Sequence, residues 1–183
     1  MKKLHLGCGR RYLPGYIHVD IDELDHVDVI TSIENLSMFE SNSIDEIYAS
    51  HVLEYFDVVQ VNDVLQEWYR VLKTNGKLRL AVPDFHNLVI LYTQTKDIKN
   101  VIGPILGRWK ISQNRTIFHK QIFDENSLKN LLNENGFGNT RFWKIEELQE
   151  NDANYDDHSM AYFPHLDFEN GIHLSLNLIS EKL

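Results

Sequence analysis

The chain has 183 residues, of which 43% are hydrophobic and 25% are charged, and its formal net charge is −9. This size and balance predict one globular domain, residues 1–183, since domains most often have about 100–200 residues. The negative charge disfavours nucleic acid as a partner. The single cysteine, Cys8, excludes an internal disulfide and fits a reducing compartment. There is neither a signal-peptide core nor a run of about 18 apolar residues, so we expect a cytoplasmic protein with no membrane partner.

The first 22 residues predict two short strands joined by a glycine turn. Gly7 and Gly9 lack side chains, so a ligand can approach the backbone of the turn closely. Asp20 follows the second apolar run and can hydrogen-bond two adjacent ribose hydroxyls, as acids do in dinucleotide sites. Asp22 is the alternative acid, and an ordinary turn with solvated carboxylates is the simpler reading. The combination predicts a site for an adenosine-containing cofactor.

Downstream, strand and helix patterns alternate, which is typical of an α/β fold with a mostly parallel sheet and helices on both faces. The further strands are expected at residues 27–31, 44–50, 77–82, 140–144 and 172–182. The helices are expected from Asp57 through Lys73, ended by Asn75-Gly76, then around 88–92 with Asp84 as its cap, and from 124–127 through Asn135, ended by Gly136. Residues 146–157 read as an acidic loop, and 96–122 have no clear pattern.

Several blocks resemble class I S-adenosylmethionine-dependent methyltransferases. They are the Gly-Cys-Gly turn with its acid, Ser50–Phe56, Trp68–Leu78, Leu131–Phe137 and Leu174–Leu178. Pro14-Gly15-Tyr16 and the short connection before residue 17 resemble a compact subfamily. The resemblance implies a Rossmann-like, seven-stranded sheet whose last strand is inserted antiparallel. It also implies an enzyme with S-adenosylmethionine as cofactor and a small-molecule acceptor, as a monomer or homodimer.

Two departures from the family pattern leave alternatives open. Arg11 occupies the position of the family's third glycine, and Ser32 stands where many relatives have an acid. Both favour a non-catalytic sensor or partner subunit as the alternative function. The connection from Gly9 to Ile17 is too short for an ordinary parallel crossover, so its helix should be reduced or absent. That shortness, with Tyr12 at the last glycine position of Gly-x-Gly-x-x-Gly, counts against an NAD or nucleotide-sugar enzyme.

By resemblance, the residues expected at the cofactor are Leu6, Gly7, Cys8, Gly9, Asp20, Ile21, Ser32, Ile33, Ser50 and His51. Ser32 would meet the adenine amino group and Ile33 would pack on the ring. His51 is also the candidate for orienting or deprotonating the acceptor, although a lone histidine is as often structural. Direct methyl displacement requires that the acceptor atom is aligned with the methyl group and, for a hydroxyl or ammonium acceptor, that a base is present. It requires no nucleophilic residue of the protein.

The residues expected at the acceptor are Asp84, His86, Arg115 and His119. Residues 96–122 hold a basic cluster, which fits a lid that binds a carboxylate or phosphate, or equally a solvated insertion. Asp84 can instead serve only as a helix cap. The histidines lack His-x-x-x-His spacing, so we expect no metal site.

Overall fold

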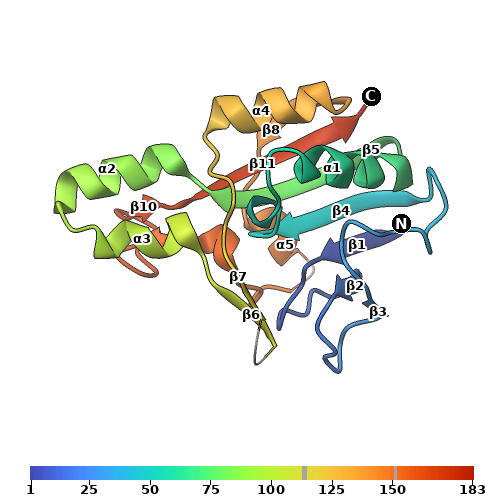
Figure 1. The fold of residues 1–183 in the computed structure, drawn as a ribbon, viewed down its shortest axis with the longest axis horizontal. Helices are drawn as coiled ribbons and strands as arrows, with labels where there is room; N and C mark the ends of the chain where they lie inside the picture. The colour runs from blue at the N-terminus through green and yellow to red at the C-terminus, as the bar shows by residue number, and fades with distance from the viewer. Residues whose placement is uncertain (113–114, 151) are drawn as a thin grey trace.

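The structure is a computed structural model of the chain. It describes residues 1–112, 115–150 and 152–183, without the side chains of residues 111–115. Seven strands form the central sheet in the order β3-β2-β1-β4-β5-β11-β8 (Figure 1). They are β1 (Lys3–Leu6), β2 (Ile17–Asp20), β3 (Val29–Ile30), β4 (Ile44–Ser50), β5 (Leu72–Pro83), β8 (Phe137–Phe142) and β11 (Ser175–Lys182). Only β11 runs antiparallel to its neighbours, β5 and β8, so the expected seven-stranded topology is confirmed.

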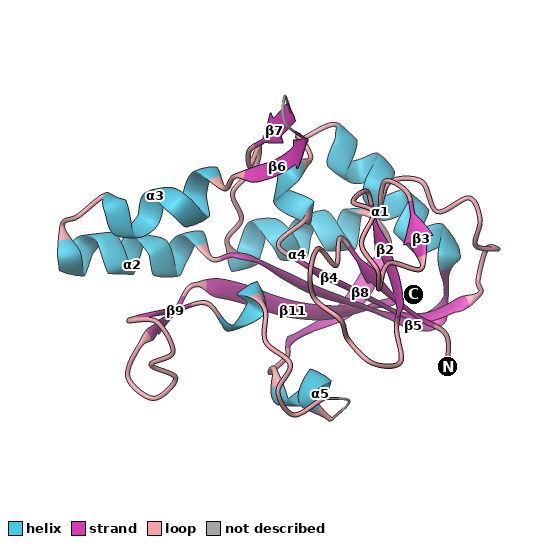
Figure 2. Ribbon diagram, turned by 90° about the horizontal axis from the view of Figure 1, so that it is seen from below, coloured by secondary structure: helices cyan, strands magenta, loops and turns pink. Residues whose placement is uncertain are grey.

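The helices cover the two faces of this sheet very unequally. Figure 2 shows α1 to α4 on one side of the sheet, whereas α5 lies on the other. The helical segments are α1 (Gln60–Val71), α2 (Phe85–Thr95), α3 (Lys99–Leu106), α4 (Glu125–Glu134), α5 (Glu146–Gln149) and the 3-10 turns η1 (Leu53–Tyr55) and η2 (His158–Met160). Two small hairpins complete the fold, β6 (Trp109–Ser112) with β7 (Arg115–Ile117) and β9 (Tyr162–Phe163) with β10 (Ile172–His173). No helix in the described parts of the chain is long and apolar enough to cross a bilayer.

The helical face holds the main core. Val61, Val64, Leu65, Trp68 and Val71 of α1 are all buried, and their spacing of three and four residues places them on one face of the helix, as an apolar stripe. Burial of each such aliphatic side chain contributes about 1.5–3 kcal/mol relative to exposure. The stripe packs against the sheet strands, whose near-continuous burial matches a sheet covered on both sides. This packing holds the carboxyl ends of β1 and β4 in fixed positions.

The boundaries of several elements differ from the expectation. The first long helix ends at Val71, because Leu72 takes an extended conformation and pairs with Ile44. The Asn75-Gly76 turn therefore lies within β5, where the register shifts, and does not end the helix. Strand β8 spans Phe137–Phe142 and starts three residues earlier than expected, directly after Gly136 at φ 87°.

Other elements are shorter than expected or are divided in two. The third strand is only Val29–Ile30, and the expected strand 172–182 divides at Leu174 into β10 and β11. The acidic stretch expected to be a loop contains α5. Asp57 does accept hydrogen bonds from the N–H groups of Val59 and Gln60, but the helix begins only at Gln60.

The connection between β1 and β2 contains no helix, as its length predicted. In its place, Leu13 and Tyr16 pack on the sheet face opposite α1 and α4, together with Tyr48, Trp143 and Tyr155. This second cluster covers the part of the sheet that a first crossover helix would cover.

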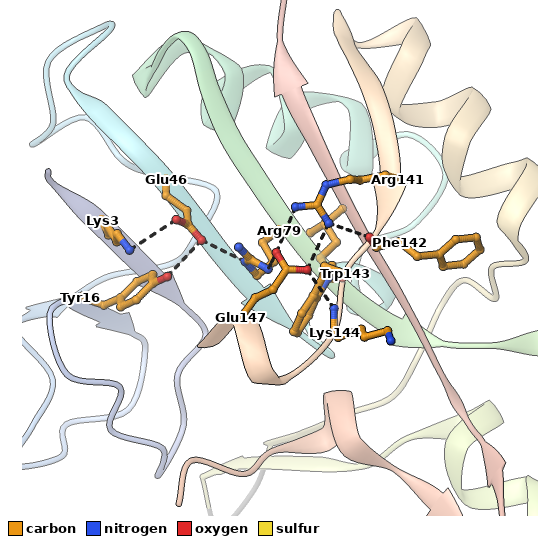
Figure 3. Close-up of polar contacts among 10 residues, drawn as sticks. Lys3, Tyr16, Glu46, Arg79, Arg141, Phe142, Trp143, Lys144 and Glu147 are labelled. Carbon is orange, nitrogen blue, oxygen red and sulfur yellow. Dashed lines mark hydrogen bonds and ion pairs between the residues drawn. The ribbon is translucent and has the colours of Figure 1, made fainter. Parts of the chain in front are cut away.

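A charged network ties this face together (Figure 3). Glu46 of β4 accepts hydrogen bonds from the Tyr16 hydroxyl and from Arg79 Nε, each at 3.0 Å. Arg79 is buried and also pairs with Glu147 of α5 at 3.2 Å. Its guanidinium lies 5.0 Å from the centre of the Trp143 ring. The short connection and α5 are thereby attached to the same two central strands.

Candidate active site

A cavity of about 1050 Å³ lies at the carboxyl ends of the parallel strands. This is the edge at which open α/β sheets bind ligands. Of the residues predicted for the cofactor, those that line it are Gly7, Cys8, Gly9, Asp20, Ile21, Ser32, Ile33, Ser50 and His51. Leu6 does not, because its side chain is fully buried in the core under β1.

The glycine turn begins directly after β1. Gly7 and Gly9 both have positive φ, 63° and 52°, a conformation that costs other residues strain. A Cβ atom on Gly7 would also overlap Cγ1 of Val52. A Cβ atom on Gly9 would lie 3.5 Å from the Trp109 ring, so the turn lies close to the insertion that follows α3. Backbone conformation and space therefore both require glycine at position 7.

Asp20 is almost fully buried at the end of β2 and is attached to the turn. Its Oδ2 atom accepts a hydrogen bond from Gly9 N at 2.7 Å, and its Oδ1 atom accepts one from Asp22 N at 2.9 Å. Each oxygen of an ionised carboxylate can accept a second hydrogen bond. The side chain is therefore held in place and retains capacity for two hydroxyl donors from the cavity.

Two polar atoms on the cavity wall lack partners in the described parts of the chain. They are Ser50 Oγ and His5 Nδ1, both buried. Burial lowers the pKa of His5 to about 3, so the ring is neutral. Buried polar atoms are normally hydrogen-bonded, and unpaired ones beside a cavity fit a polar ligand. Together with the turn and Asp20, they fit a ligand that carries a ribose and an amino-acid group.

A family model described as "Methyltransferase domain" matches residues 4–80, the segment that contains the turn, Asp20 and His51. Over these residues the chain is similar to methyltransferases, as the sequence blocks implied. The strand order and the antiparallel β11 agree with the fold that this family implies.

Solved structures of such methyltransferases share the fold. One from Archaeoglobus fulgidus is 19% identical, with a TM-score of 0.57 over 99% of this chain and 86% of the other. One from Methanosarcina mazei is 20% identical, with a TM-score of 0.59 over 100% and 92%. The 1,6-didemethyltoxoflavin-N1-methyltransferase of Burkholderia thailandensis, solved with its substrate and S-adenosylhomocysteine, is 14% identical, with a TM-score of 0.55 over 98% and 70%. No curated protein matches the sequence at a significant level.

His51 lies just after β4, in a left-handed conformation with φ 53°. Its Nε2 atom is 3.1 Å from Ser175 Oγ, and its Nδ1 atom is 3.5 Å from a carboxyl oxygen of Glu54. Burial, and then the nearby His158, lower the pKa of His51 to about 3. The ring is thus a neutral part of the wall, held by protein groups on both nitrogens.

Cys8 is buried in the glycine turn. Burial, and then the charge of Asp20, raise the pKa of its thiol to about 12. A thiol in this state is a poor nucleophile. The structure therefore agrees with the expectation that Cys8 lines the turn and takes no covalent part in the reaction.

The insertion forms the opposite wall of the cavity. Pro104, Gly107, Trp109 and Ile117, from α3 and the β6–β7 hairpin, line it, and so does the predicted acceptor residue His119. The backbone of Arg115 lies in β7, but its side chain is outside the described part of the structure. The insertion thus lines the cavity, and its role as a lid remains a prediction.

The other two residues predicted for the acceptor are not brought to this cavity. Asp84 accepts hydrogen bonds from His86 N at 3.0 Å and from Asn87 N, and so caps α2. His86 is exposed on the first turn of that helix. The side chain of Asp84 therefore caps the helix, which was the alternative to a role in acceptor binding.

Sequence reasoning missed several residues of the wall. Asp157 is half-buried and accepts hydrogen bonds from the Tyr48 hydroxyl, the Tyr155 hydroxyl and Ser159 N. Although burial opposes it, hydrogen bonds from Ser159 and Tyr48 keep the pKa of Asp157 below its usual value. The further missed residues include His5, Arg10, Arg11 and Tyr55. A signal existed only for Arg10 and Arg11, which directly follow the turn.

Proposed function

We propose that this protein is an S-adenosylmethionine-dependent methyltransferase that transfers the methyl group to an oxygen or nitrogen atom of a small polar molecule, one that carries a carboxylate or phosphate. The observation that carries the proposal is one continuous cavity, with the glycine turn and Asp20 on one wall and the basic insertion on the other. Sites for small molecules have volumes of about 300–1,000 Å³. A cavity of about 1050 Å³ has room for the cofactor and a small acceptor together.

In this proposal, the cofactor lies along the turn. Gly7 and Gly9 allow close approach, Asp20 accepts hydrogen bonds from the ribose, and Ser32 and Ile33 meet the adenine. Ser50 and His5 offer polar atoms to the amino-acid group. The cofactor supplies a methyl group that is already electrophilic, so the protein's task is to align the acceptor atom with it and to remove a proton.

Arg108 is the best candidate for binding an anionic acceptor. It lies on the insertion and lines the cavity, and no described carboxylate pairs with it. By contrast, Lys120 donates to Gln60 and Arg11 pairs with Asp156, so both are already engaged. A guanidinium is suited to bidentate recognition of carboxylate or phosphate. His51 and His119 on the same cavity would orient the acceptor atom.

The test is transfer of labelled methyl groups from S-adenosylmethionine to paired acceptors that differ only in a carboxylate or phosphate. We expect label in the anionic members of the pairs. Arg108→Ala should raise KM for them about tenfold or more, since charged hydrogen bonds contribute about 1.5–3 kcal/mol. Lys110→Ala is the matched control, because this exposed lysine does not line the cavity. Equal labelling of the neutral members would exclude the anionic class, and binding without any transfer would favour the non-catalytic alternative.

A further inference from the structure

Glu54 is a fully buried carboxyl group without hydrogen bonds. It lies in η1, its side chain has no exposed surface, and neither carboxyl oxygen has a hydrogen-bond partner among the described residues. A buried ionised carboxylate in this state is strongly unfavourable. Burial accordingly raises the pKa of Glu54 to about 8. Glu54 itself does not line the cavity, but its two nearest titratable neighbours do.

Two histidines converge on one oxygen of this carboxyl. His51 Nδ1 lies 3.5 Å and His119 Nε2 lies 3.6 Å from Glu54 Oε1. The two rings come from distant segments, one after β4 and the other after β7. The protonation state of Glu54 therefore depends on which ring nitrogen atoms of the two histidines carry hydrogen.

The hydrogen on His119 is assigned by a backbone carbonyl. His119 Nδ1 lies 3.0 Å from the carbonyl oxygen of Pro104. A carbonyl only accepts hydrogen bonds, so Nδ1 must carry the hydrogen. Burial lowers the pKa of His119, so the ring is neutral and its Nε2 atom presents a lone pair to Glu54.

The hydrogen on His51 is assigned by a chain of three side chains. Asn177 Nδ2 donates to the Ser159 carbonyl at 3.0 Å, which orients the amide. Its Oδ1 atom therefore faces Ser175, whose hydroxyl donates to it at 2.8 Å. Ser175 Oγ then accepts from His51 Nε2 at 3.1 Å. The neutral His51 is left with a lone pair on Nδ1, which also faces Glu54.

Two lone pairs that face one carboxyl oxygen favour a proton on that oxygen. We propose that Glu54 is a carboxylic acid in the free protein, that His51 and His119 share its proton, and that this proton leaves when a cation binds in the adjoining cavity. The cation is the sulfonium of S-adenosylmethionine, whose positive charge stabilises an ionised carboxylate.

The other groups around this triad do not replace the cation. Tyr55 lies edge-on to His119, and burial and Glu54 raise its pKa to about 12, so it is neutral. The ring of His158 lies 5.4 Å from that of His51. Asp157 and His173 also act on His51, with opposite effects on its pKa. No described lysine or arginine side chain pairs with the Glu54 carboxyl.

The proposal gives the acceptor's proton a destination. When the acceptor atom bonds to the methyl group, the electrons of the broken S–C bond stay on sulfur. Ionised Glu54 can then receive the proton that the acceptor loses, by way of the lone pair on His51 Nδ1 or on His119 Nε2. The sulfonium charge and the carboxylate charge thus disappear in the same turnover. This last step rests on the proposed O–H or N–H acceptor, whereas ionisation on binding does not.

The first experiment is calorimetric titration of the full chain with S-adenosylmethionine and with S-adenosylhomocysteine near neutral pH, in two buffers of different protonation enthalpy. The two ligands share every group except the charged sulfur and its methyl. We expect S-adenosylmethionine to release up to about one proton more than S-adenosylhomocysteine. Glu54→Gln should abolish this difference, and Glu34→Gln, at an exposed carboxylate on the cavity wall, should preserve it. Equal release with both ligands would overturn the proposal.

An infrared measurement on the wild-type protein covers the case in which Glu54→Gln does not fold. A band of a protonated carboxyl should be present in the free protein, disappear with S-adenosylmethionine and persist with S-adenosylhomocysteine. Absence of the band, or a band unchanged by both bound ligands, would refute the proposal alone. Failure of both ligands to bind would instead remove the cofactor assignment and the proposal with it.

Discussion

The backbone N–H of Gly9 donates a hydrogen bond of 2.7 Å to Oδ2 of Asp20. This bond joins the glycine turn after β1 to the acid at the end of β2, so the two parts of the predicted cofactor site form one unit. The acid therefore has two tasks, to hold the turn and to accept hydrogen bonds from the cavity.

We expect Asp20→Ala to weaken binding of S-adenosylmethionine by roughly 10- to 100-fold, because charged hydrogen bonds contribute about 1.5–3 kcal/mol. Asp20→Asn keeps one carbonyl oxygen for Gly9 N and should lose less affinity. Calorimetric titration measures both, with Asp25→Ala as the control at an exposed carboxylate nearby. Unchanged affinity in Asp20→Ala would show that the acid only holds the turn.

Gly7→Ala should lower the free energy of unfolding by about 2 kcal/mol or more, since both a positive φ and overlap with Val52 oppose a side chain. Gly15→Ala is the control, because Gly15 has φ 84° but no atom near its Cβ position, so only the backbone cost of about 1 kcal/mol remains. Denaturant unfolding compares them. Adding Val52→Ala to Gly7→Ala should recover part of the loss, and no recovery would mean that backbone strain dominates.

Asp84→Ala should destabilise the protein by about 0.5–2 kcal/mol, because the cap of α2 is lost. KM for the acceptor should not change, since Asp84 does not line the cavity. Thermal unfolding and steady-state kinetics separate the two effects. A raised KM at unchanged stability would restore the role in acceptor binding that the sequence suggested.

Stability should fall in acid through Glu147. The Arg141 guanidinium, and then other partners including Arg79, lower the pKa of Glu147 from its ordinary 4.5 to about 2 in the folded protein. The stabilisation is therefore complete above about pH 4.5 and is lost as the pH falls towards 2. Arg141→Ala should flatten this part of the profile of unfolding free energy against pH.

Lys144→Ala is the matched control for this profile, because it removes an exposed charge but keeps the backbone N–H that bonds Glu147. An unchanged acid profile in Arg141→Ala would contradict the assigned cause.

The cofactor wall, formed by the glycine turn and Asp20, could be predicted because its residues lie close together in the sequence. The turn and Asp20 are separated by few residues, and the expected absence of a first crossover helix followed from that spacing. The helix α1 could be predicted for the same reason, because the 3.6-residue period of its apolar side chains can be read from the local sequence alone. The boundary at Val71 was missed because pairing of Leu72 with Ile44 overrides the turn signal of Asn75-Gly76.

The acceptor wall could not be predicted in this way. Glu54 reads as a helix-supporting acid in the sequence, and only the folded chain brings His119 and the Ser175 hydroxyl to the same place. Asp157 lies in a stretch that looks like a solvated acidic loop, yet it accepts hydrogen bonds from the hydroxyls of Tyr48 and Tyr155. Long-range packing determines these contacts, and no local pattern encodes it.

The contrast between these two walls has a consequence for how the molecule forms. The Gly9–Asp20 bond spans 11 residues, whereas the His51–Ser175 contact spans 124. Loops of short span close at lower entropic cost, so we expect the cofactor wall to acquire its shape early in folding. The acceptor wall, which includes His51 and its partner Ser175, can form only after β11 has inserted between β5 and β8. A chain that emerges from the ribosome thus acquires its specificity for an acceptor only after β11 has been synthesised.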